Sequence, residues 1–266
     1  MITFQKYVKA ESLEEAYTLN QVKNNKILGG MLWLRLGTPT YNTVIDISGL
    51  SLDSIEENDE QFKIGAMVTL RELETNESLN EYTNNAIKDA LKDIIGTQFR
   101  NLATIGGSIW GRFGFSDVLT VFLALDSYVE LYKGGIVSLA DFANMQYDND
   151  ILMNIIVKKK PCKCVYDSVR IQRTDFPVLT CAASVIDGEY KIAIGARPGK
   201  ACLFGDDKNI LSNGITNESA SLFAKELESL VVTSSNNRGS AEYRSRLVNV
   251  LTERNLIKLG GLMWWI

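Results

Sequence analysis

Two pairs of adjacent glycines constrain this 266-residue chain more than any other feature of its sequence. Gly29-Gly30 follows the short apolar stretch KIL, and Gly106-Gly107 lies within the stretch ATIGGSI. Each pair is expected at a junction between a strand and a turn. There, the missing side chains would let the backbone approach a diphosphate closely, with amide N–H groups as donors. Neither pair fits the spacing of a Rossmann or P-loop site, and either pair taken alone is better explained by a simple turn.

The sequence contains no histidine. This excludes the most common general base and zinc ligand, together with every Ser–His or Cys–His nucleophile. If the chain takes part in catalysis, a bound cofactor is expected to carry the chemistry. Among the four cysteines only Cys162 and Cys164 are close, in an apolar strand-like stretch, and a four-thiolate cluster needs more ligands than that. Buried thiols in a reducing cytoplasm are the expectation.

Composition indicates a globular protein of more than one lobe, since 45% of the residues are hydrophobic and 23% are charged. The net charge of −4 argues against nucleic acid and anionic membranes as partners, because both require a basic surface. The N-terminal segment does not read as a signal peptide. No stretch approaches the roughly 20 apolar residues that span a bilayer.

The pattern of apolar residues predicts an α+β chain of three lobes, at residues 1–52, 53–160 and 161–266. The first lobe is expected to contain a helix over 11–24, with Ser12 as its N-cap and Glu15 completing a capping box. Hairpins are expected where the turn residues KGG and DG separate apolar runs. The other expected strands cover 26–28, 43–47, 62–67, 128–132, 136–139, 150–157, 164–173, 180–186 and 190–196, and the other expected helices cover 70–73, 84–94, 118–125, 218–231 and 240–256.

The text around the second glycine pair is the most specific part of the sequence. RNLATIGGSI, followed by SDVL, resembles the R-N-x-A-T-I-G-G-N-I … S-D-L pattern of the flavin subunits of xanthine dehydrogenase and carbon monoxide dehydrogenase, in the molybdenum hydroxylase family. Further matches keep the family's order along nearly the whole chain. They are ILGGMLWL for A-G-G-T-D-L, FKIGA for L-x-I-G-A, LALDS for L-A-L-D-A, residues 139–142 for x-x-D-F, and RGSAEYR for R-G-S-A-x-Y-R.

The resemblance implies a two-lobed FAD-binding domain of the vanillyl-alcohol oxidase-like (PCMH) type. A C-terminal α+β domain like that of the carbon monoxide dehydrogenase flavoprotein would follow it. In such subunits FAD lies extended between the lobes, and main-chain amides of both glycine turns hold its diphosphate. The Thr104 hydroxyl is then expected to donate to a phosphate oxygen, and Asp117 to accept from flavin sugar hydroxyls. Carried over by position, the FAD-binding residues are Leu28, Gly29, Gly30, Met31, Trp33, Thr104, Gly106, Gly107, Ser108 and Asp117.

Several residues depart from the family pattern. Met31 and Leu32 replace a threonine and an acidic residue after the first glycine pair, and Ser108 replaces an asparagine after the second. Backbone contacts survive such changes, but losing two side-chain partners is expected to weaken FAD binding or shift the flavin potential.

Further side chains allow two interpretations each. Trp110, Phe113 and Phe115 would stack on the isoalloxazine or adenine, or simply pack a loop or an interface. Arg112 would pair with a phosphate or, the simpler expectation, be solvated. Asp175 would touch the flavin or substrate or, the simpler expectation, make no such contact. Arg238 and Tyr243 are expected to position the last helix, and the apolar segment 261–266 is expected to dock on another lobe or a partner.

The leading functional prediction is an electron-transfer subunit of a cytoplasmic complex. A molybdopterin-binding large subunit would hydroxylate the substrate, and a small [2Fe-2S] subunit would pass electrons to FAD on this chain and then to NAD⁺ or another acceptor. One alternative is a FAD-free structural or assembly subunit that retains the fold, which Met31 and Leu32 favour modestly. Another is a stand-alone flavoprotein oxidase, although no large substrate domain or histidine tether is visible.

Overall fold

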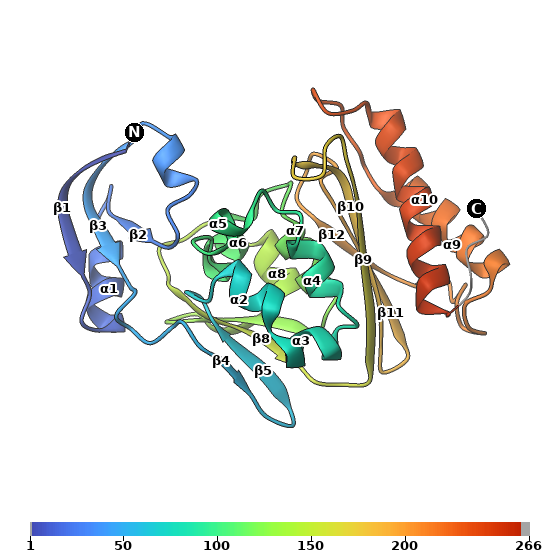
Figure 1. Ribbon diagram of the computed structural model, residues 1–266, viewed down its shortest axis with the longest axis horizontal. Coiled ribbons are helices and arrows are strands. Elements are labelled where there is room, and N and C mark those ends of the chain that lie inside the picture. Colours follow the sequence, from blue (N-terminus) through green and yellow to red (C-terminus); the bar gives the residue numbers. More distant parts are fainter. Residues whose placement is uncertain (1, 262–266) are drawn as a thin grey trace. The chain divides into compact units, whose positions relative to one another are not determined.

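The computed structural model of the chain describes residues 2–261, which form two compact units whose segments alternate along the sequence (Figure 1). Unit 1 comprises Met1–Glu72, Thr97–Gly111 and Tyr128–Lys158, and unit 2 comprises Leu73–Gly96, Arg112–Ser127 and Lys159–Ile266. The mixture of helices and sheets confirms the predicted α+β class. The three-lobe boundaries stay a prediction. Residues 262–266 of the predicted docking segment lie outside the described residues.

Unit 1 begins with a three-stranded parallel sheet in the order β1-β3-β2. The central strand carries Val44 and Ile45, both fully buried, and helix α1 packs on the Ile45 side through Ala16. The predicted N-cap is confirmed, because the Ser12 hydroxyl accepts from the Glu15 N–H at 3.1 Å. The Glu15 carboxylate reaches back to the Glu11 N–H, one residue earlier than a capping box requires. The bounds are β1 Thr3–Lys9, α1 Leu13–Asn20, β2 Lys26–Leu28, the 3₁₀ helix η1 Leu34–Leu36, and β3 Thr40–Asp46.

A five-stranded sheet in the order β4-β5-β8-β6-β7 completes unit 1. The hairpin predicted from the KGG turn is present as β6 and β7, and helix α6 packs against β8. Strand alternation accounts for β6, whose residues are buried in a period of two. The bounds are β4 Ile55–Glu57, β5 Gln61–Gly65, α5 Thr97–Arg100, α6 Ile105–Gly111, β6 Ser127–Leu131, β7 Gly135–Ser138, α8 Leu139–Asn144 and β8 Leu152–Lys158, while α2, Leu70–Thr75, runs from unit 1 into unit 2.

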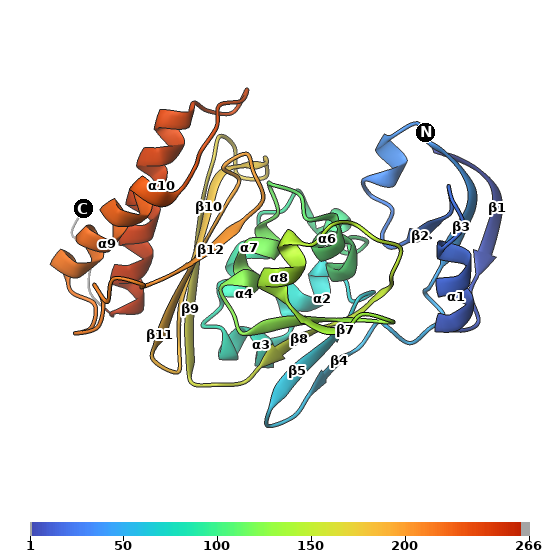
Figure 2. The same cartoon turned by 180° about the vertical axis from the view of Figure 1, so that it is seen from behind.

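Unit 2 is a four-stranded antiparallel sheet, β12-β11-β10-β9, covered on both faces. Helices α4 and α7 lie on one face, and α9 and α10 lie side by side on the other (Figures 1 and 2). Coverage on both faces explains why nine of the ten residues of β10 are buried and why this strand reads as a continuous apolar run. The bounds are α3 Glu77–Tyr82, α4 Ala86–Leu91, α7 Asp117–Leu123, β9 Cys162–Arg170, β10 Pro177–Ile186, β11 Glu189–Gly195, β12 Cys202–Gly205, α9 Asn217–Leu230 and α10 Ala241–Leu259.

The loop before α10 is anchored by Arg244, the last residue of the RGSAEYR stretch. Its guanidinium is buried and donates to the carbonyls of Val178, Ser234 and Gly239 at 2.6–2.9 Å, and to the side chain of Asn236 at 2.6 Å. These four bonds use four of the five N–H donors of the planar guanidinium, a geometry that lysine cannot reproduce. Arg244 therefore has the helix-positioning role that the sequence suggested for its neighbours Arg238 and Tyr243.

A buried ion pair lies in unit 2 between helix α7 and strand β9. The Asp117 carboxylate accepts hydrogen bonds from the Tyr166 hydroxyl and the Arg170 guanidinium, and the side chains of the ion pair are 6% and 8% exposed. Burial raises the pKa of Asp117 to about 6, although Arg170 and Tyr166 act in the opposite direction. Both bonds are made to the same carboxylate oxygen, Oδ1, which joins α7 to β9.

Within the described part of the chain, no helix combines the length and the hydrophobicity needed to cross a membrane. The same residues contain no cluster of cysteine and carboxylate side chains suited to a metal ion. Cys162 and Cys164 are both free thiols; Cys164 is buried, as expected from the sequence, whereas Cys162 is only partly buried.

The Asp117–Arg170 pair generates a stability prediction. Asp117→Ala should lower the free energy of unfolding by about 3–5 kcal/mol, because arginine cannot shed its charge once its buried partner is gone. Arg170→Met should cost less at low pH, because Asp117 can bind a proton. Urea titrations over a pH series, monitored by far-UV circular dichroism, measure both effects.

The pH dependence has a defined sign. The folded pKa of about 6 lies above the usual value of 3.8, so the contribution of Asp117 to stability is fully present below that value and falls as the pH rises through about 6. Without Arg170 this fall should be steeper and should continue to higher pH. Equal losses for both single variants at every pH would contradict the buried-pair interpretation.

Candidate functional site

The first glycine pair packs against residues 102–104, the segment that leads into the second pair in unit 1. A β-carbon at Gly30 would lie 1.8 Å from the carbonyl oxygen of Leu102, and one at Gly29 would lie 2.9 Å from Thr104 Oγ1. No residue with a side chain fits at position 30 without moving backbone. The corner after β2 and the segment before α6, far apart in sequence, thus meet through direct backbone contact.

The second glycine pair differs from its expected local structure. Gly106-Gly107 lies in the first turn of helix α6, not at the junction of a strand and a turn. The preceding residues run beside the segment after β5, where the Ile105 N–H donates to the Val68 carbonyl at 2.9 Å and the Gly106 N–H donates to the Ala66 carbonyl at 2.8 Å. A β-carbon at Gly106 would lie 2.5 Å from that same oxygen, so tight packing rather than a turn requires glycine here.

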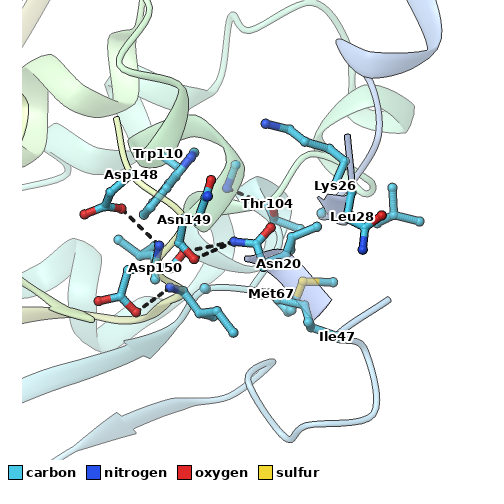
Figure 3. A pocket seen from close by; sticks show the side chains of 18 residues that line it. Asn20, Lys26, Leu28, Ile47, Met67, Thr104, Trp110, Asp148, Asn149 and Asp150 are labelled. Carbon is cyan, nitrogen blue, oxygen red and sulfur yellow. Dashed lines mark hydrogen bonds between the residues drawn. The ribbon is translucent and has the colours of Figure 1, made fainter. Parts of the chain in front are cut away.

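A pocket of about 140 Å³ opens beside these glycines (Figure 3). Its volume suits a segment of a dinucleotide rather than the whole molecule. The walls come from the end of α1, from β2, from the start of α6 and from the loop that precedes β8. The lining residues are Asn20, Asn25, Lys26, Ile27, Leu28, Gly29, Ile47, Ala66, Met67, Thr104, Gly106, Gly107, Trp110, Asp148, Asn149, Asp150, Ile151 and Leu152.

Five of the ten predicted FAD-binding residues line this pocket, namely Leu28, Gly29, Thr104, Gly106 and Gly107. Four others lie near it in sequence but not on its wall. Gly30 packs on Leu102, Met31 adopts a left-handed backbone with φ 60°, Trp33 is 40% exposed, and the Ser108 hydroxyl donates to the Thr104 carbonyl at 3.0 Å.

Asp117 belongs to unit 2, where the ion pair with Arg170 engages it. Its predicted contact with flavin sugar hydroxyls stays a prediction, and its observed partners provide a structural role that requires no ligand.

Thr104 is the polar side chain of the pocket that is best placed to donate to a ligand. Its side chain is buried, and Oγ1 accepts a hydrogen bond from the Gly107 N–H at 3.2 Å. The hydroxyl donates to no residue within the described range, so its proton can be donated to a ligand atom. The N–H groups of Gly29 and Gly30 also make no hydrogen bond to another residue in the described range 2–261. Donors without acceptors are what an anionic group requires.

The wall opposite the glycines was not anticipated from the sequence. The Asp150 carboxylate accepts from the backbone N–H groups of Lys133, Gly134 and Ile151 at 2.7–3.2 Å, which fixes the loop before β8. Asn20 and Gln21 at the end of α1 donate to the Asn149 carbonyl at 2.7 and 2.9 Å. No sequence motif predicts these bonds, because they join side chains to the backbone of irregular loops.

The three aromatic side chains that allowed two interpretations belong to different units. Trp110 lines the pocket and packs against Phe142 in unit 1, with ring centroids 5.8 Å apart. Phe113 and Phe115 belong to unit 2 and stack at 5.3 Å, and Phe115 also contacts Phe176 at 4.6 Å. These contacts make the two phenylalanines part of an aromatic cluster.

Arg112 and Asp175 are charged residues of unit 2. The expectation of a solvated Arg112 is wrong, because this residue is only 2% exposed. Its backbone is left-handed, with φ 43°, directly after the last residue of α6. Asp175 pairs with Arg238 at 3.5 Å in unit 2, and its predicted contact with flavin or substrate stays a prediction.

Comparison with known proteins places these observations in a family. The sequence matches the family described as the FAD binding domain in molybdopterin dehydrogenase over residues 2–159. It is 27% identical to the glyceraldehyde dehydrogenase medium chain of Sulfolobus acidocaldarius over 92% of this chain and 95% of that protein. It is 25% identical to the nicotine 6-hydroxylase medium subunit of Paenarthrobacter nicotinovorans over 96% of this chain and 97% of that protein.

The fold has a close counterpart among solved structures. A chain of reconstituted CO dehydrogenase from Oligotropha carboxidovorans superposes with a TM-score of 0.84 at 19% identity, covering 98% of this chain and 99% of that chain. This likeness confirms the fold implied by the resemblance. Because the family match spans more than half of the chain, the chain belongs to the FAD-binding domains of the molybdopterin dehydrogenases, whose cofactor is FAD.

Proposed function

We propose that this chain is the FAD-binding medium subunit of a molybdenum hydroxylase complex, in which it relays electrons from a partner's iron–sulfur clusters to NAD⁺ or another acceptor. The observation that carries the proposal is the meeting of the two glycine corners at one pocket with unused hydrogen-bond donors. Both corners lie inside the segment that matches the family.

The pocket residues fit the diphosphate of FAD. Gly29 and Gly107 both face Thr104 Oγ1, at 2.9 and 3.2 Å from where their β-carbons would be, so side chains at either position would crowd the one hydroxyl with a free proton. The Thr104 hydroxyl and the Gly29 N–H, both on the pocket wall, would hold the phosphate oxygens, with the Gly30 N–H next to that of Gly29 along the chain. Leu28 and Trp110 would shield these bonds from water, which strengthens them.

Of the other predicted contacts, Met31, Trp33 and Ser108 remain assigned to the stretches of FAD that extend beyond this pocket. Bound FAD would supply both one-electron and two-electron redox chemistry, and the protein's part is to bind, orient and tune it.

The division of labour in the complex is inferred from the relatives and from the residues. The relatives named above are medium chains or medium subunits of a dehydrogenase and a hydroxylase. This chain lacks histidine, and its described residues offer no cysteine cluster for iron–sulfur binding. A molybdopterin-binding large subunit and a [2Fe-2S] small subunit are therefore its proposed partners. Four free cysteines support assembly in the cytoplasm.

A FAD-free assembly subunit is the second candidate. The observation that favours it is that Leu32, where the family has an acidic residue, is buried at 6% exposure and offers no polar contact. The flavin content of the purified chain separates the two candidates, because only the first predicts bound flavin.

Gly107→Val should abolish flavin binding by filling the space beside Thr104. We expect the absorbance ratio of flavin to protein to fall to background while far-UV circular dichroism stays unchanged. Gly205→Val is the matched control, because a β-carbon there meets only Asp207 Oδ1, at an ordinary 3.4 Å. Normal flavin content in folded Gly107→Val would place the diphosphate elsewhere.

Thr104→Val removes the hydroxyl while keeping the shape of the side chain. Its FAD dissociation constant should rise about tenfold, the effect of losing one hydrogen bond to a charged group. Thr104→Ser, which keeps the donor, should stay close to wild type. Titration of apoprotein with FAD, followed by flavin fluorescence, measures both constants, and equal affinities for the two variants would exclude Thr104 as a phosphate donor.

A further inference from the structure

The pocket has a single cationic lining residue, Lys26. It is the first residue of β2, three positions before Gly29, and its side chain is exposed. In Figure 3 this side chain extends from β2 toward the Trp110 side of the pocket. The strand that ends in the first glycine corner thus also carries a positive charge.

Lys26 has no carboxylate partner among residues 2–261. The two acidic lining residues are engaged elsewhere, since Asp150 accepts three backbone N–H groups and Asp148 accepts the Asp150 N–H at 3.0 Å. Ion pairs of this unit fall outside the pocket, for example between Lys133 and Glu14 at 3.2 Å. The ammonium group is consequently available to a ligand.

The glycine corners supply only neutral donors. Backbone N–H groups and the Thr104 hydroxyl stabilise a phosphate, but they do not neutralise its charge. The Met31 side chain makes no hydrogen bond within residues 2–261, and Leu32 leaves no acidic side chain at this corner to compete for a nearby cation. A lysine is a point charge well suited to a phosphate oxygen.

We propose that Lys26 contacts a phosphate of the bound dinucleotide and replaces the side-chain partners that the first glycine corner lacks. The proposal rests on the proposed function, since it requires a dinucleotide in this pocket. It assigns the adenosine diphosphate half of the ligand, rather than the flavin ring, to the β2 side of the pocket.

The test uses the full chain, stripped of flavin, titrated with FAD, ADP and riboflavin at low and high salt. Lys26→Met should weaken FAD and ADP by the same factor, about tenfold at low salt, and should leave riboflavin unchanged. Salt should weaken FAD binding to wild type more than to the variant, because the lost contact is ionic. Lys26→Arg should restore most of the affinity.

Lys23→Met is the matched control, since Lys23 is an exposed lysine on the same connection and does not line the pocket. If Lys23→Met and Lys26→Met lost equal FAD and ADP affinity, the effect would come from net charge alone, and the assignment would be overturned. Unchanged FAD and ADP affinities in Lys26→Met would overturn it as well, while leaving the FAD-binding function intact. A folded wild-type chain that binds neither FAD nor ADP would overturn both.

Discussion

The carbonyl oxygen of Leu102 occupies the place that a side chain at position 30 would need. This contact, together with the one between Gly106 and the Ala66 carbonyl, lets the β2 corner and the α6 corner share one pocket. The two glycines of each pair therefore have different roles. Gly30 and Gly106 allow the backbones to touch, whereas Gly29 and Gly107 keep space open around the Thr104 hydroxyl.

Much of the fold followed from local sequence. Strand β2 was predicted with its observed bounds, the Ser12 cap was correct, and the Asp187-Gly188 hairpin has the positive φ angles, 51° and 85°, that its turn residues favour. The edge strand β1 was missed, because six of its seven residues are exposed or nearly so and it shows no alternation. The helix at Gly106-Gly107 was also missed, since two glycines disfavour a helix and only packing on Ala66 imposes it.

The site was predictable only in its backbone part. Motif spacing located the glycines and Thr104, but the burial of Arg112 and the engagement of Asp117 by Tyr166 and Arg170 depend on residues distant in sequence. The wall around Asn149 consists of side-chain to backbone bonds in a loop, which carry no periodic signal. Binding through main-chain amides, as proposed here for FAD, would let the pocket keep its chemistry while Met31 and Leu32 depart from the family pattern.

The alternation of the two units along the chain has a consequence for biogenesis. Unit 1 takes its last strand from β8, and unit 2 takes the helices α3, α4 and α7 from segments synthesised well before its sheet. Residue 158 must therefore leave the ribosome before unit 1 can close, and helix α10 must leave it before unit 2 can. Long-range closure of this kind slows folding and leaves apolar helices such as α7 unburied in the interim. Neither unit corresponds to a continuous segment of the sequence, so cutting the chain at two positions cannot isolate either unit intact.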